Sequence, residues 1–278
     1  MSTQEVISTN NLSKKENLQM SSKNQYTLWQ VLGIWLAGSA PMWLLSWVVY
    51  PAMSVSLSQV DAGLLRMKLL AVGLIWQFVL AMIILYREEG NIRLGTISRR
   101  FWLNHPVSAK TGETKKSLWW WIIPLILLVA LVDVGLNSAL VNLTVAIFPF
   151  FAEPKGYDMS TIFAPELHAQ WVGAWDLLGL FFTMSLFSNF LGEEFLFRGV
   201  LLPKMEGVFG KWDWVANGVM FGLYHLHQPW TLLGNILFGW IVAFSGKRFH
   251  SNWFPIILHN GQAVFFLPLI LGLVLGLA

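Results

Sequence analysis

The feature that most constrains this chain is a series of apolar segments, each about 18 to 25 residues long and separated by polar stretches. A helix of that length crosses a hydrocarbon layer about 30 Å thick. Of the 278 residues, 55% are hydrophobic and only 12% are charged, whereas soluble domains carry about 25% charged residues. The chain is therefore predicted to be an all-α, polytopic integral membrane protein in contact with membrane lipid.

The segments predict about seven spans, with six to eight as the range, in a single transmembrane domain over residues 26–278. Residues 1–25 are polar and lack the apolar core of a signal peptide, so we expect them to form a disordered tail. A half-length or interfacial helix is expected near residues 141–151. The expected spans cover residues 28–49, 69–86, 118–136, 171–202, 214–229, 232–244 and 255–278.

Charge predicts the orientation of these spans. Basic residues gather between the second and third spans, and after the fourth and sixth, so the positive-inside rule places these loops and the amino terminus in the cytoplasm. The net charge of +3 then reflects topology and contact with anionic lipid, and we expect no nucleic-acid partner. The chain has no cysteine, which excludes disulfides, thiolate metal sites and cysteine nucleophiles.

Three ionisable residues in the last spans are expected at a similar depth. Glu193, His225 and His259 each lie eleven or twelve residues from a charged residue near the basic face, which is about 16–18 Å along a helix. Ionisable groups inside a membrane are costly and usually face the bundle interior. The common depth therefore predicts one buried site. The three reference residues are Lys204, Asp213 and Arg248.

The neighbouring residues suggest how such a site is arranged. Glu194 and Arg198 stand four residues apart, so they share a helix face and can pair, while Glu193 is rotated about 100° away. Alternatively, this segment is a cytoplasmic helix end whose charges reach the interface. His227 cannot share a face with His225 and is expected to be interfacial or structural. For His259, the alternative role is a hydrogen bond between helices.

A carboxylate with two imidazoles suits two chemistries. In the first, Glu193 is a general base that activates water, and an imidazole polarises the peptide carbonyl or stabilises the oxyanion. In the second, Glu193, His225 and His259 bind a divalent metal such as zinc, which activates the water. The H-E-x-x-H spacing of many zinc peptidases is absent.

Three segments resemble the motifs of a known family. Residues 193–199, EEFLFRG, match an E-E-x-x-x-R motif, and residues 221–225, FGLYH, match an F-x-x-x-H motif. Residues 254–259, FPIILH, resemble a last motif with a histidine early in a late helix. In this order and spacing they resemble the CAAX prenyl protease and bacteriocin-processing (CPBP, or Abi) family of intramembrane proteases. The resemblance covers about residues 170–265.

The resemblance implies a function and a set of roles. It implies an intramembrane endopeptidase acting on a peptide or lipidated protein in a bacterial plasma membrane. Glu193 matches the glutamate that activates water without a required metal, and His225 and His259 match the two catalytic-site histidines. The supporting residues would be Glu194, Arg198, Phe221 and Asn260.

One position departs from the family pattern. The last motif normally carries Asn or Asp four residues after its histidine, where this chain has Ala263. Asn260 is rotated about 100° from His259 and is a poor geometric substitute, whereas Gln262 lies on the His259 side of the helix. Loss of one oxyanion donor typically lowers the rate about 10²- to 10³-fold.

Two alternatives follow from these residues. Ala263 motivates a non-catalytic membrane protein of the same fold, acting in bacteriocin self-immunity or as a scaffold. Asp133, Asp176 and Asn235 motivate a small transporter, although no inverted repeat is visible in the sequence.

Overall fold

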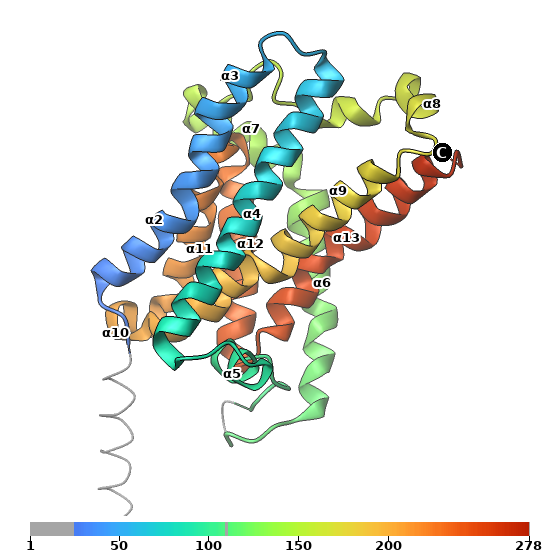
Figure 1. The fold of residues 1–278 in the computed structure, drawn as a ribbon. Helices are drawn as coiled ribbons and strands as arrows, with labels where there is room; N and C mark the ends of the chain where they lie inside the picture. Colours follow the sequence, from blue (N-terminus) through green and yellow to red (C-terminus); the bar gives the residue numbers. More distant parts are fainter. Residues whose placement is uncertain (1–24, 109–110, 278) are drawn as a thin grey trace, which may run out of the picture.

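The computed structural model describes residues 25–108 and 111–277, apart from the side chains of Gln262 and Phe265. Within these ranges every regular element is helical, which confirms the predicted helical membrane bundle (Figure 1). The predicted disordered tail, residues 1–25, lies outside the described residues except for Gln25.

The amino-terminal half begins with two long helices. The first is built from α2 (Leu28–Leu44), the π-helical turn η1 (Leu45–Val49) and α3 (Tyr50–Ser54). Thr27 starts it with a capping box, in which its hydroxyl accepts from the backbone N–H of Gln30, 3.3 Å away. The second is α4 (Gln59–Glu89), which runs back alongside α2 (Figure 1).

The middle of the chain lies at the periphery of the helical bundle. It includes α5 (Leu94–Arg100) and a third long segment made of η2 (Lys116–Trp121), α6 (Ile122–Ala130) and η3 (Leu131–Gly135). Only 11% of the most apolar part of this segment is buried, as expected for a helix facing lipid. The expected helix near 141–151 is present as α7 (Asn137–Ile147), followed by η4 (Pro149–Phe151).

The carboxy-terminal half supplies the helices that surround the predicted site. After the short α8 (His168–Trp171), the chain forms α9 (Trp175–Leu186), η7 (Phe187–Leu191) and η8 (Glu194–Leu201), the last two being π-helical. The small α10 (Glu206–Phe209) follows. The remaining helices are α11 (Asp213–Tyr224), α12 (Leu232–Phe249) and α13 (Trp253–Val274).

Fewer than seven of the described helices qualify as candidate membrane spans. Among the described residues, four helices are long and apolar enough to cross a membrane, or up to six if each bent pair counts as one span. Six lies within the expected range. The difference arises at residues 214–229, where α11 ends after twelve residues and 3-10 turns replace the rest of the expected span.

The basic loops lie together at one end of the bundle. The carboxyl-terminal end of α4, with α5 and α10, occupies the lower end of the bundle in Figure 1. Two basic residues at this end form ion pairs within the protein. Arg100, only 7% exposed, bonds to Glu88 at 2.8 Å, and Lys204 contacts the same carboxylate at 3.0 Å.

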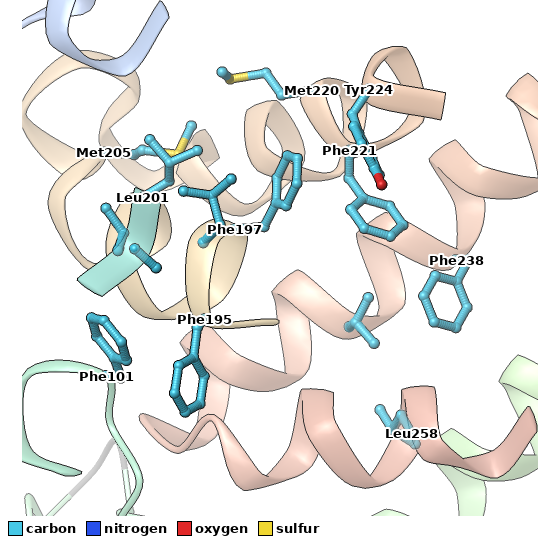
Figure 2. Close-up of a cluster of buried hydrophobic side chains, with 14 of the residues drawn as sticks. Phe101, Phe195, Phe197, Leu201, Met205, Met220, Phe221, Tyr224, Phe238 and Leu258 are labelled. Carbon is cyan, nitrogen blue, oxygen red and sulfur yellow. The ribbon is translucent and has the colours of Figure 1, made fainter. Parts of the chain in front are cut away.

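The core lies where the carboxy-terminal helices meet (Figure 2). Phe197 projects from η8 and Phe221 and Tyr224 from α11, while Phe238 and Leu258 come from α12 and α13. The α11–α12 contact depends on small residues, because a Cβ atom on Gly218 would lie 2.7 Å from the backbone nitrogen of Trp240. Such close backbone approach is typical of helix pairs in membranes.

Candidate active site

Glu193 lies at the junction of the two π-helical turns η7 and η8. A Cβ atom on the preceding Gly192 would lie 2.7 Å from the backbone oxygen of Leu74, so glycine allows α4 to approach this junction. Glu193 is 3% exposed. Its Oε1 accepts a hydrogen bond from the Tyr224 hydroxyl at 3.0 Å, while its Oε2 has no partner among the described residues.

His259 lies between the two carboxylates of the motif. Its Nδ1 is 2.9 Å from Oε1 of Glu194, and its Nε2 is 3.8 Å from Oε2 of Glu193. The first distance is a hydrogen bond, and the second is too long for one. Because a carboxylate only accepts, Nδ1 of His259 donates to Glu194, and Nε2 faces Glu193.

Glu194 and Arg198 form the ion pair that their spacing predicted. Nη1 of Arg198 lies 3.2 Å from Oε1 of Glu194, and both side chains are 0% exposed. The guanidinium also lies over the Phe221 ring, with Cζ 4.1 Å from the ring centroid. The alternative of a helix end reaching the interface is therefore wrong for Arg198.

His225, the second histidine of the site, lies directly after the last residue of α11. Nδ1 of His225 donates to the backbone oxygen of Phe221 at 2.9 Å, and the two ring centroids are 4.6 Å apart. The Phe221 ring is also 6.1 Å from that of His259. His227 is buried, and its Nδ1 is 3.2 Å from the Tyr224 carbonyl, which is consistent with a structural role.

Glu193, His225 and His259 are the ligands that the metal alternative requires. Among the described residues, no three His, Asp or Glu side chains come close enough together to hold a metal ion. Glu193 and His259 are neighbours, and Nδ1 of His225 bonds to the Phe221 carbonyl. The three expected ligands therefore do not form one cluster within the described residues.

Asn260 binds backbone carbonyls, and Ala263 lines a cavity. Asn260 donates to the backbone oxygens of Ile256 at 2.8 Å and Asn189 at 3.2 Å, so its amide is used by the helix contact with η7. Ala263 is one turn beyond His259 and lines a cavity of about 370 Å³. The side chain of Gln262 lies outside the described residues. The other lining residues are Met67, Met159, Ser160, Phe163, Phe181, Met184, Ser185, Ser188, Asn189 and Phe266.

Sequence reasoning missed two residues of the site. Tyr224 is fully buried and supplies the hydroxyl that binds Glu193. Asn252 donates to the backbone oxygen of Glu194 at 3.2 Å, at the start of η8. Tyr224 could have been found from the requirement that a buried carboxylate have a donor, because it is the polar residue next to His225.

The fold and site define a helical membrane protein with a buried glutamate between a tyrosine and a histidine. Residues 174–277 match the family model of Rce1-like type II CAAX prenyl endopeptidases. This match agrees with the family resemblance of the three motifs, and this part of the chain is similar to a family of CAAX-type membrane proteases. No curated protein and no solved structure gives a significant match.

Proposed function

We propose that the protein is an intramembrane endopeptidase in which Glu193 activates water. The observation that supports this most is the free Oε2 of Glu193, which is buried and 3.8 Å from Nε2 of His259. Because these two atoms are only 3.8 Å apart, one water molecule can form a hydrogen bond of about 2.8 Å to each of them. The Tyr224 bond to Oε1 fixes the carboxylate so that Oε2 faces this position.

The chemistry then proceeds in two balanced steps. The water oxygen bonds to the peptide carbonyl carbon, its proton moves to Oε2 of Glu193, and the carbonyl oxygen becomes an oxyanion. The C–N bond then breaks, and Glu193 returns the proton to the leaving amine. A water-excluding site strengthens each of these electrostatic interactions.

The hydrogen bonds of the two histidines assign them different roles. Glu194 accepts from Nδ1–H of His259, which orients the ring so that Nε2 faces Glu193; when this imidazole is protonated, its Nε2–H can stabilise the oxyanion. Nδ1–H of His225 is used by the Phe221 carbonyl, so its neutral Nε2 is an acceptor. We assign His225 to orient the water or the leaving amine.

The cavity beside Ala263 suggests where the substrate lies. It extends from Asn189, one turn before Glu193, to Ala263, one turn after His259. Its lining is mainly apolar side chains and serine hydroxyls. We therefore assign it to an apolar part of a peptide or lipidated protein next to the cleaved bond. A bacterial plasma membrane and a cytoplasmic amino terminus belong to the same proposal.

The test is cleavage of a membrane-inserted peptide library by purified protein in nanodiscs, read by mass spectrometry. Glu193→Gln should abolish the products, because the amide cannot take the proton. Glu206→Gln, in an exposed ion pair with Lys247, is the matched control and should cleave like wild type. Equal cleavage by both variants would refute the assignment.

A non-catalytic role is the second candidate, because Ala263 offers no amide donor. It predicts that protection of cells against a peptide toxin survives Glu193→Gln. The transporter alternative gains no support, since Asp176 is exposed at the start of α9 and Asn235 bonds to Thr231 within its own helix.

A further inference from the structure

The turn that carries Tyr224 and His225 contains backbone carbonyls that lie beyond the regular hydrogen bonds of α11. α11 ends at Tyr224, and the 3-10 turns η11 (His225–His227) and η12 (Pro229–Thr231) lead into α12. Carbonyl groups at a helix end lack the N–H donors of a following helical turn. When they are buried, leaving them unpaired is costly, so other donors must supply the hydrogen bonds.

Two tryptophans of the first helix supply donors to this turn. Nε1 of Trp43 donates to the Tyr224 carbonyl at 2.9 Å, and Nε1 of Trp47 donates to the Leu226 carbonyl at 2.8 Å. A third, Trp35, donates to the Met220 carbonyl one turn earlier, also at 2.8 Å. The tryptophans therefore do more than contact lipid, because each N–H is directed at a particular carbonyl of the α11 segment.

The last carbonyl of the turn receives two further donors. The hydroxyl of Ser46, in η1, donates to the His227 carbonyl at 3.0 Å, and Nη2 of Arg66 approaches the same oxygen at 3.4 Å. Arg66 is 1% exposed, and its Nη1 bonds to the Tyr157 carbonyl. Its guanidinium lies 4.6 Å from the Tyr157 ring centroid, which fixes it in place.

We infer that Trp43, Ser46, Trp47 and Arg66 form a clamp that positions the turn for the proposed reaction. The clamp lies outside residues 174–277, which match the family model. Its residues touch no reacting atom, so they are positioning residues. This inference rests on the proposed function for its effect on rate, but its effect on the turn is independent of catalysis.

The clamp acts on both functional groups of the turn. Tyr224 supplies the hydroxyl that holds Glu193, and His225 follows it directly. A displacement of about 1 Å in a reacting group can lower a rate about 10²-fold. Loss of clamp bonds should therefore lower kcat while substrate binding at the separate cavity beside Ala263 is retained.

The chain offers matched controls for two clamp residues. Ser46 and Ser39 are both buried in the first helix, at 1% and 0% exposure, but the Ser39 hydroxyl has no hydrogen-bond partner among the described residues. Both Ser46→Ala and Ser39→Ala therefore remove a buried hydroxyl oxygen, but only Ser46→Ala also removes a hydrogen bond of the clamp. Trp47→Phe is matched by Trp76→Phe, because Nε1 of Trp76 donates to the Ala37 carbonyl, away from the turn.

The first readout is amide hydrogen exchange of a peptide covering residues 222–231, measured in nanodiscs. Ser46→Ala and Trp47→Phe should speed exchange at residues 225–228 about tenfold. Ser39→Ala and Trp76→Phe should leave it within about twofold, and Ser46→Thr should restore the wild-type rate. The clamp hypothesis would be refuted if exchange were unchanged in both clamp variants, or if it increased equally in their control variants.

The second readout is steady-state kinetics on a cleaved peptide. The Trp43→Phe/Trp47→Phe double variant should lose about 10- to 100-fold in kcat with KM within about twofold. A rise in KM at constant kcat would contradict a positioning role. If Glu193→Gln retained activity, the proposed chemistry would fail while the exchange result would still decide the clamp.

Discussion

Replacing Arg198 by methionine should destabilise the fold far more than the same change at Arg99. Arg198 and Glu194 are both 0% exposed and 3.2 Å apart. Removing the cation leaves a buried carboxylate supported by His259 alone. Breaking a buried pair in this way costs about 3–5 kcal/mol. The lost contact with the Phe221 ring, at 4.1 Å, acts in the same direction.

Arg99 is the matched control for this change. It pairs with Glu89 at 2.6 Å, a shorter distance, but its side chain is 66% exposed. Exposed pairs contribute about 0–1 kcal/mol, because water and ions screen them. The comparison therefore separates burial from distance as the source of stability.

The assay is the free energy of unfolding from equilibrium denaturant titration in mixed micelles. Arg198→Met should lower it by about 3–5 kcal/mol and Arg99→Met by less than about 1 kcal/mol. The double variant Arg198→Met/Glu194→Leu should recover much of the loss, because no buried charge is left unpaired. A cost below about 1 kcal/mol for Arg198→Met would refute the buried pair.

Three further predictions concern activity. Tyr224→Phe removes a charge-assisted bond of about 1.5–3 kcal/mol to Glu193, so kcat should fall about 10- to 100-fold with little change in KM; an unaltered kcat would remove the tyrosine from the mechanism. Ala263→Leu should fill part of the adjacent cavity and shift kcat/KM toward substrates with smaller apolar groups by about 10- to 200-fold; the same loss for every substrate would argue against a specificity pocket. Incubation with EDTA should leave cleavage unchanged, and restoration of lost activity by zinc would reinstate the metal alternative.

The sequence predicted the long helices and the pairing of Glu194 with Arg198, for simple physical reasons. Apolar length defines long helices, and the four-residue spacing of Glu194 and Arg198 defines a shared face. The similar spacing of Glu193 and His259 from charged residues suggested one buried site, and in the structure Oε2 of Glu193 lies 3.8 Å from Nε2 of His259. These features depend on helix geometry, which is regular.

The irregular parts could not be predicted in the same way. The π-helical turns η7 and η8 leave no local sequence signal, because they depend on close packing, as at Gly192 against α4. The carbonyls of Tyr224 and Leu226, where α11 ends, accept hydrogen bonds from Trp43 and Trp47, far away in the sequence. Tryptophan at a predicted membrane boundary suggests an aromatic belt, and composition cannot distinguish that role from a directed hydrogen bond.

The most direct test of the central claim is the single-turnover cleavage rate of one peptide by wild type, Glu193→Gln and Glu206→Gln, with EDTA present. If Glu193 is the general base, the first substitution should lower the rate about 10²- to 10⁴-fold and the second should not change it. A Glu193→Gln rate within a few fold of wild type would contradict the account.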